Sequence, residues 1–260
     1  MFEIDWRSAA AYQHAKVIPA AGFAWEYLRR DDDYHRDFDR LNRPKSPTAR
    51  TMEAFSQRWG YDFPRNPLEP ADRESVFWIP SLQPEAVLLS TTSPARGSAA
   101  MLVDLTHLPA LDLRRADDGW HGVWRAGGIV HQFWLAQEPS DTIAAYTATL
   151  PLDGLFELRA HAARRLWRAL NGRSPGRPFR AMPAQLRELH ILTLRALDAR
   201  QCGESYRTIA EALLGFRGTK TDWEGDPRKN KARRLVASGQ RMMRGGYRTL
   251  LHYPIKLPRR

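Results

Sequence analysis

The sequence predicts an α+β protein made of a helical N-terminal segment, a small and mostly antiparallel sheet, and a C-terminal all-α domain of helix-turn-helix type. Three observations support this fold class. Apolar residues recur at helical spacing in the first 60 residues, short apolar runs bounded by Pro, Ser and Gly fill residues 75–150, and helical spacing returns after Asp153. We therefore expect domains at residues 1–63, 71–152 and 153–260.

Composition excludes several classes of protein. The chain has 260 residues, 43% of them hydrophobic, so it can bury a core and is not mainly disordered. No apolar run reaches the roughly 18 residues that span a bilayer, and the start MFEIDWRS lacks the features of a secretory signal. Cys202 is the only cysteine, which excludes an internal disulfide and multi-cysteine zinc sites. We expect a cytoplasmic protein with no membrane partner and no cofactor.

Basic charge is concentrated in the C-terminal part of the chain. Residues 159–260 carry 24 Lys and Arg against 7 Asp and Glu, whereas residues 1–158 carry 16 against 22. The formal net charge is therefore +17 in the C-terminal part and −6 in the remainder. A surface of this charge attracts polyanions, of which nucleic acid is the usual one.

The N-terminal segment predicts two helices, AAGFAWEYLRR (Ala20–Arg30) and DDDYHRDFDRL (Asp31–Leu41). Their apolar residues recur at intervals that can form a buried stripe: Phe23, Leu28, Tyr34, Phe38 and Leu41. The acids Asp31–Asp33 suit the positive end of a helix dipole, and contact with a basic partner is the alternative. The Pro-rich stretch from Pro64 to Pro70 predicts an irregular connection.

Strands are expected in SVFWIP, EAVLLSTT, AMLVDLTHL and TIAAYTATL, which are short and rich in β-branched or apolar residues. The run WHGVWRAGGIVHQFWLA predicts a hairpin whose turn is Arg125–Gly128, with Gly127 or Gly128 at positive φ. The histidines His107, His121 and His131 lie in or beside these strands. Their spacing matches no metal motif, which favours ordinary strand residues over ligands.

Helices return in LFELRAHAARRLWRALNG, which Gly172 ends, and in AQLRELHILTLRALDAR, which follows Pro183. The arginines Arg164, Arg165 and Arg168 form either a second phosphate-binding strip or a solvent-facing side. SYRTIAEALLG predicts the next helix, with Ser205 as its N-cap and Gly215 at its end.

The stretch DPRKNKARRLVASGQRMMRGG predicts a helix that begins at Asp226-Pro227 and ends at Gly245–Gly246. With about 100° between residues, one side carries the core residues Ala232, Leu235, Val236, Gly239, Met242 and Met243. The opposite side carries Asn230, Arg233, Arg234, Ala237, Arg241 and Arg244. No acidic residue occurs from Pro227 to Arg260, although a solvent-facing helix normally mixes Glu with Lys and Arg. This pattern favours contact with nucleic acid over a plain basic surface.

The last two of these helices predict a helix-turn-helix, in which the second helix enters the major groove and the first crosses the backbone. The connection from Gly215 to Asp226 has 12 residues instead of roughly three or four, so the turn is enlarged. Trp223 in this turn is expected to pack as a hydrophobic plug. The expected DNA-binding residues are basic or amide-bearing side chains of both helices and the turn: Arg207, Arg217, Lys220, Arg228, Lys229, Asn230, Arg233, Arg234, Arg241 and Arg244.

Two stretches of the sequence resemble known domains. RALDARQCGESYRTIAEALLG followed by DWEGDPRKNKARRLVASGQRMMRGGYRTLL is similar to a proteobacterial helix-turn-helix variant of regulators of integrative and conjugative elements. DWRSAAAYQHAKVIPAAGFAWEYLRRDDDYHRDF resembles the domain often placed before it. Proteins with both parts are similar to excision activators, whereas short relatives with the C-terminal part alone act as antiactivators. Glu224 and Asp226 depart from the basic or polar segment of these relatives.

The resemblance implies a transcriptional activator of excision and transfer genes that binds promoter DNA in the nucleoid. RNA polymerase and a homologous antiactivator are the protein partners it implies. The alternative is an interaction module that pairs with a homologous regulator without binding DNA. The sequence has no Walker loop, no GxSxG elbow and no clear cluster of carboxylates, so we expect no enzymatic activity, catalytic residue or metal site.

Overall fold

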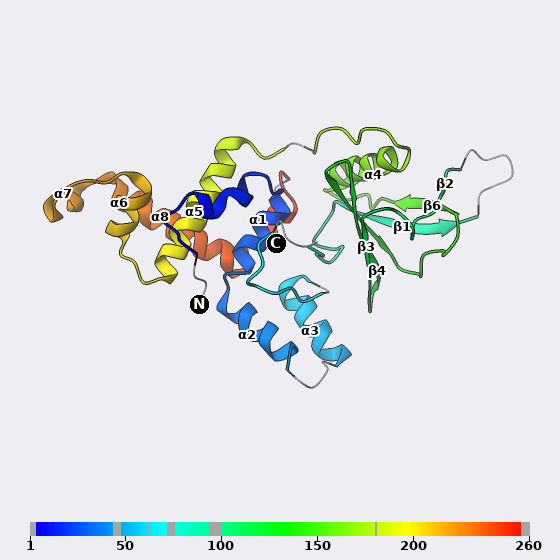
Figure 1. Cartoon of the computed structure of the whole chain (residues 1–260), viewed down its shortest axis with the longest axis horizontal. Coiled ribbons are helices and arrows are strands. Elements are labelled where there is room, and N and C mark those ends of the chain that lie inside the picture. Colours follow the sequence, from blue (N-terminus) through cyan, green and yellow to red (C-terminus); the bar gives the residue numbers. More distant parts are fainter. Residues whose placement is uncertain are drawn as a thin grey trace. The chain divides into compact units, whose positions relative to one another are not determined.

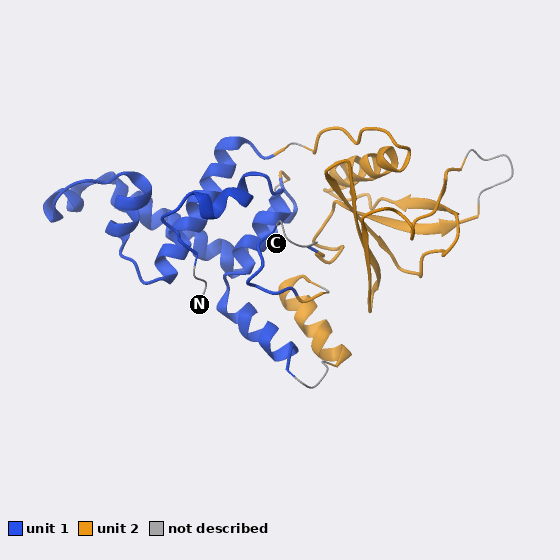
Figure 2. Cartoon of the chain, viewed as in Figure 1, with its two compact units in different colours: residues 1–46, 65–76, 182–253 blue, residues 47–64, 77–181, 254–260 orange. Residues whose placement is uncertain are grey.

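The chain folds into two compact units, each assembled from separate stretches of sequence. The computed structural model describes residues 4–43, 48–61, 63–71, 76–93, 100–179 and 181–255. Unit 1 comprises Met1–Ser46, Arg65–Val76 and Met182–Tyr253, and unit 2 comprises Pro47–Pro64, Phe77–Ala181 and Pro254–Arg260 (Figure 2). The N-terminal helices therefore share one compact unit with the C-terminal helices. The domains predicted from the sequence, at residues 1–63, 71–152 and 153–260, separate these two sets of helices.

Unit 1 contains helices from both ends of the chain (Figure 1). Those of the N-terminal segment are a 3₁₀ helix at Ala10–Lys16, α1 (Ala20–Leu28) and α2 (Asp32–Leu41). Those of the C-terminal segment are α5 (Ala184–Gln201), α6 (Tyr206–Leu214), α7 (Lys220–Gly225), α8 (Pro227–Arg241), a π-helical turn at Met242–Gly246 and α9 (Arg248–Leu251). The predicted helices are present, but α8 ends at Arg241 and not at Gly245–Gly246, because a π-helical turn follows it. Met242 and Met243, which were predicted as core residues, lie in that turn and are half-buried. α7 is an additional short helix inside the predicted turn.

The residues expected at helix ends occupy those positions. The Asp31 side chain accepts a hydrogen bond from the backbone N–H of Asp33 at 2.8 Å and so caps α2. Ser205 does the same for α6 by accepting from the N–H of Thr208 at 3.1 Å. Gly215 ends α6 in the left-handed conformation, at φ +67°.

α5 connects the two ends of the chain within unit 1. Arg30, just after α1, donates hydrogen bonds to Asp198 of α5 from Nε to Oδ1 at 2.6 Å and from Nη2 to Oδ2 at 2.9 Å. The Tyr12 hydroxyl donates to the same Oδ2 at 2.5 Å, and Arg30 Nη1 donates to Glu26 Oε2 at 2.8 Å. All four side chains are buried. Because a buried charge is costly unless it is paired, this network requires that α1 and α5 stay together.

Other hydrogen bonds join α5 to the N-terminal segment along its length. The Tyr27 hydroxyl lies 3.0 Å from His190 Nδ1, and Arg195 Nε donates to the Trp6 carbonyl at 2.9 Å. Near the end of α5, Gln201 Nε2 donates to the Arg30 carbonyl at 2.9 Å. One side of α5 therefore contacts the N-terminal segment, and another side packs against α8.

Unit 2 combines α3 (Ala49–Trp59) and α4 (Phe156–Leu170) with a six-stranded sheet. The strands in chain order are β1 (Ala86–Thr92), β2 (Leu102–Val103), β3 (Leu111–Ala116), β4 (Gly119–Ala126), β5 (Ile129–Leu135) and β6 (Ala144–Thr149). Across the sheet their order is β2-β6-β1-β5-β4-β3. β1 and β5 pair in parallel and the other neighbouring strands pair antiparallel, so the sheet is mixed.

The hairpin prediction is confirmed, but two strand predictions need correction and one strand was not predicted. Only Leu102–Val103 of AMLVDLTHL form a strand, β2. β4 and β5 pair up to Ala126 with Ile129, and Gly127 and Gly128 form the two-residue turn at φ +57° and +75°. SVFWIP is not a strand, because in its described part only Trp78 makes an isolated bridge, with Tyr61. Ser75 lies outside the described residues. β3 was not predicted, since its charged residues resemble a loop and an edge strand needs only one hydrogen-bonded neighbour.

Candidate nucleic-acid interface

α8 has the predicted start and the predicted two-sided character. The Asp226 side chain accepts a hydrogen bond from the N–H of Arg228 at 2.7 Å, and Pro227 occupies the first turn. The buried side consists of Ala232, Leu235, Val236 and Gly239. The exposed side consists of Asn230, Arg233, Arg234, Ala237, Arg241 and Arg244. The helix therefore presents three arginines, Asn230 and one small residue to solvent, with Arg244 beside them in the π-helical turn, in place of the usual mixture of charges.

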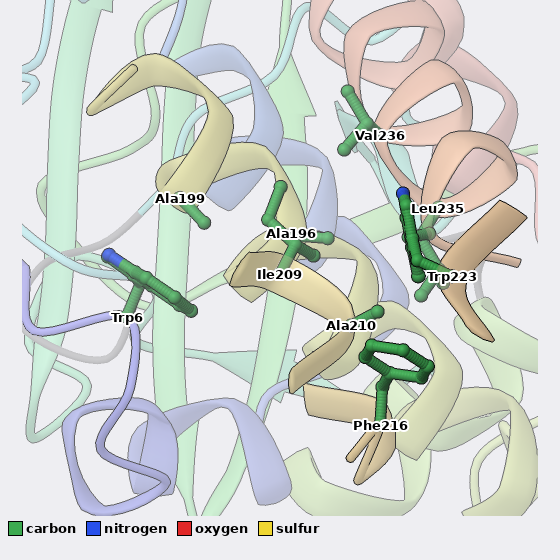
Figure 3. Packing of buried hydrophobic residues seen from close by; sticks show 10 residues of the cluster. Trp6, Ala196, Ala199, Ile209, Ala210, Phe216, Trp223, Leu235 and Val236 are labelled. Atoms are coloured by element: carbon green, nitrogen blue, oxygen red, sulfur yellow. The ribbon is translucent and has the colours of Figure 1, made fainter. Parts of the chain in front are cut away.

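α8 is held against α5 and α6 by a continuous apolar cluster (Figure 3). α5 supplies Ala196 and Ala199, α6 supplies Ile209 and Ala210, and α8 supplies Ala232, Leu235 and Val236. The N-terminal segment adds Trp6 to the same cluster. Three helices around one core give α8 a rigid support, which a surface that reads DNA requires.

Gly239 permits the close approach of α8 to α5. A Cβ atom at this position would lie 2.9 Å from the Leu197 Cβ and 3.3 Å from the Thr193 carbonyl oxygen. These separations are shorter than ordinary van der Waals contacts, so a larger residue forces the helices apart. The distance between the two helices therefore depends on this glycine.

The enlarged turn between α6 and α8 is ordered by its own contacts. Thr219 and Asp222 form a capping box at the start of α7. Trp223 is buried and meets the ring of Phe216 edge-on, with 5.1 Å between the ring centroids. Trp223 thus packs as the predicted hydrophobic plug.

Each of the three acids in this turn has a structural partner. Hydrogen bonds from the Thr219 backbone and hydroxyl lower the pKa of Asp222. A hydrogen bond from Lys229, at 2.7 Å, lowers the pKa of Glu224. Asp226 caps α8. The acids that depart from the pattern of the similar regulators therefore stabilise the turn and the start of α8.

Four of the predicted site residues are engaged within the protein. Arg207 donates to Glu211 Oε1 at 2.9 Å and to the Gly218 carbonyl at 2.8 Å. Arg217 donates to the Glu211 and Phe216 carbonyls at 3.1 and 3.0 Å. Arg228 donates to the Gly215 carbonyl at 2.9 Å, and Lys229 pairs with Glu224. These four side chains fasten the turn to the helices on either side of it.

The other six predicted site residues face solvent. Within the described part of the chain they make no ion pair or side-chain hydrogen bond, and the guanidinium of Arg233 lies 5.8 Å from the centre of the Tyr206 ring. The six are Lys220, Asn230, Arg233, Arg234, Arg241 and Arg244. Lys231 is also exposed and was not predicted, because about 100° of rotation separates it from Asn230. The basic residues beside Lys231 in the sequence were the feature that could have identified it as a candidate site residue.

The three arginines of α4 do not form a continuous exposed strip. Arg164 is exposed, Arg165 is half-buried, and burial lowers the pKa of Arg165 against the opposing effect of Glu85. Arg168 Nε donates to the Ser174 carbonyl at 2.6 Å. Only Arg164 thus has the character of a surface cation.

The described residues contain no group of three His, Cys, Asp or Glu side chains that could hold a metal ion. His107 and His121 each lie 2.7 Å from a carboxylate oxygen, of Asp104 and Asp118 respectively. His131 is buried beside Trp124, and burial lowers its pKa to about 4. No helix in the described ranges is both long and apolar enough to cross a membrane.

Comparison with known families matches both ends of the chain. Residues 149–252 match the family model described as the DNA-binding domain of a T6SS transcription factor. Residues 5–64 match that of a proteobacterial transcriptional regulator-like domain. No curated protein and no solved structure matches the chain significantly. The exposed side of α8 lies within the DNA-binding match, and residues 65–148 lie outside both matches.

Proposed function

We propose that this protein is a transcription regulator that inserts α8 into the major groove of duplex DNA, in a variant of the helix-turn-helix arrangement. Family models of a transcription-factor DNA-binding domain and of a regulator-like domain support the general function. One observation carries the assignment to α8: its exposed side holds Asn230, Arg233, Arg234 and Arg241 around Ala237, with no acidic residue on the helix. Arg and Asn are the side chains whose geometry suits guanine and adenine edges.

In this proposal α6 is the first helix, α8 is the recognition helix, and α5 is the support. The 15 residues of α8 extend for about 22 Å, which is long enough to lie along the groove and reach phosphates on its margins. Ala237 lies at the centre of the basic side and has no long side chain to hold the helix away from the base edges. The short helix α7 replaces the tight turn, since its capping box and the Trp223 plug hold α6 and α8 together.

The basic side chains divide into two groups in this proposal. Arg207, Arg217, Arg228 and Lys229 shape the turn through the internal contacts already described, and contribute to the field that attracts DNA. The six solvent-facing residues make the direct contacts. Those near the middle of α8 read bases, while Lys220 and Arg244 contact phosphates.

We further propose that the protein activates excision and transfer genes of an integrative and conjugative element, in the cytoplasm and without catalytic activity. The resemblance of both parts of the chain, in the same order, to excision activators supports this process. RNA polymerase and a homologous antiactivator are the partners that the same resemblance suggests. The matched DNA-binding family is described for a T6SS transcription factor.

The test measures binding of the full chain to the DNA upstream of its own gene. Fluorescence anisotropy is recorded at several salt concentrations, with a scrambled duplex of equal length as the control. We expect tighter binding to the upstream duplex and a steep loss of affinity with salt, because phosphate contacts release counterions. No binding at low salt would overturn the proposal and favour the module that pairs with a homologous regulator. Genome-wide immunoprecipitation then identifies the genes beside the bound sites.

A further inference from the structure

Unit 2 contains a pocket between the sheet and α4. Its volume is about 550 Å³, within the range of roughly 300–1,000 Å³ that is typical of small-molecule sites. β1 and β6 form its floor with Val87, Leu89 and Ala148, and α4 forms its wall with Ala163, Leu166 and Leu170. The sheet residues of this pocket lie outside both family matches.

The strand register shows which side chains face this pocket. Leu89 of β1 pairs with Ala148 of β6, and Thr91 pairs with Tyr146, so these residues share one face of the sheet. Val87 and Leu89 on that face pack in one cluster with Leu166 of α4. Thr149 pairs with Leu88 and lies on the opposite face. Tyr146 and Ala148 therefore face α4, and Thr149 faces away from it.

The pocket is apolar apart from hydroxyl groups. No described residue that lines it carries a charge, and its largest polar side chain is Tyr146. The Tyr146 hydroxyl is itself shielded from solvent, so the ring of Tyr146, and not its hydroxyl, contributes to the lining.

We propose that this pocket binds a neutral, mainly apolar small molecule. The apolar lining favours an apolar ligand, and no charged residue of the described lining is present to offset the desolvation of an ionised one. The sheet and α4 enclose a space of small-molecule size, which favours this occupant over a partner helix. The proposal does not depend on DNA binding by α8.

The test uses the neutral fluorophore N-phenyl-1-naphthylamine, which has one N–H group and an apolar body. Fluorescence of the probe is titrated with the full-length protein and with two variants. Ala148→Phe places a ring at the pocket. Thr149→Phe adds the same ring on the opposite face of the same strand and serves as the matched control. Circular dichroism establishes that each variant is folded.

We expect saturable binding of one probe per chain, with similar affinity for Thr149→Phe. Ala148→Phe should weaken binding at least about 10-fold, because the added ring takes up space that the probe needs. Absence of saturable binding to the wild type overturns the proposal, as does equal binding by Ala148→Phe and Thr149→Phe. Sedimentation velocity tests whether a second copy of the chain occupies the pocket face instead. If the wild type is a dimer that Ala148→Phe dissociates, and the probe does not bind, this face is an interface between copies and the proposal is overturned.

Discussion

Arg30 and Asp198 are 168 residues apart in the sequence and form a buried ion pair with two hydrogen bonds, of 2.6 and 2.9 Å. Burial opposes the charge on Arg30, but Asp198 and Glu26 raise its pKa, so Arg30 remains charged. The pair joins the end of α1 to the helix on which α8 packs. The N-terminal segment is therefore a structural part of the body that carries the candidate DNA interface.

Replacing Asp198 alone should strongly destabilise the protein. Asp198→Leu leaves the buried Arg30 without its main partner, and breaking a buried pair in this way costs about 3–5 kcal/mol. We expect a loss of this size in the free energy of unfolding of unit 1, measured by urea denaturation.

The double variant Arg30→Met/Asp198→Leu should recover part of the loss, because no buried charge then remains. Arg36→Met is the control, since Arg36 pairs with Asp33 at an exposed site, where removal costs no more than about 1 kcal/mol. Equal losses for Asp198→Leu and Arg36→Met would show that the buried pair does not hold the helices together.

Glu26 should make the stability of unit 1 sensitive to acid. Burial opposes its ionisation, but Arg29, His14 and Arg30 hold the pKa of Glu26 well below its usual range. The native state thus binds this proton more weakly than the unfolded chain, whose Glu has a pKa of about 4.3. The contribution of the carboxylate is therefore complete above about pH 5 and is lost as the pH falls through the native pKa.

The variant Glu26→Gln tests this direction of the pH dependence of stability. The difference in the free energy of unfolding between wild type and variant should be largest above about pH 5 and should shrink steadily at lower pH. Glu188→Gln, at an exposed position of α5, is the control and should give a curve parallel to that of the wild type. If the difference in the free energy of unfolding between wild type and Glu26→Gln stays constant across the acid range, the pKa of Glu26 is not lowered in the native state.

The arginines of α8 should differ in how they affect DNA binding. Arg233→Ala or Arg241→Ala should weaken binding to the cognate site by about 1–3 kcal/mol if the guanidinium makes two hydrogen bonds to guanine. A residue that contacts phosphate should weaken all sequences alike and reduce the salt slope by about 0.9. Titrations with cognate and scrambled duplexes distinguish these outcomes. The control Arg36→Ala, at an exposed position of α2, should change neither the affinity nor the salt slope. Unchanged affinity of both α8 variants would show that α8 is not part of the interface.

Local features of the interface could be predicted from the sequence, whereas its long-range supports could not. The caps of α6 and α8 and the two sides of α8 depend on residues within about four positions of one another, so spacing reveals them. The partners of Arg207 and Arg228 lie 11 and 13 residues away, across a turn whose path the sequence does not specify. The pairing of Arg30 with Asp198 requires the tertiary fold. The parallel pairing of β1 with β5 was missed for the same reason.

Gly239→Ala should separate α5 from α8 and destabilise unit 1. The added Cβ would approach the Leu197 Cβ to 2.9 Å, and overpacking of this kind costs about 1–3 kcal/mol. The higher helix propensity of alanine compared with glycine offsets up to about 1 kcal/mol of this loss. Thermal denaturation measures the net loss. Gly225→Ala is the matched control, since a Cβ there has no neighbour within 4 Å, and that variant should be neutral or slightly stabilised. A stabilised Gly239→Ala would show that the helices are less closely packed.

Ala237→Glu should change stability and DNA affinity in opposite directions. Ala237 is exposed on α8 and lies four residues from both Arg233 and Arg241. In the unbound protein a Glu at this position would pair with these arginines and stabilise the helix by a few tenths of a kcal/mol. On DNA the same carboxylate would face the phosphates and base edges, so we expect affinity to fall by at least about 10-fold. Ala237→Gln has nearly the same shape without the charge and should lose much less. Equal affinities of the Glu and Gln variants, with both proteins folded, would place the exposed side of α8 away from the DNA.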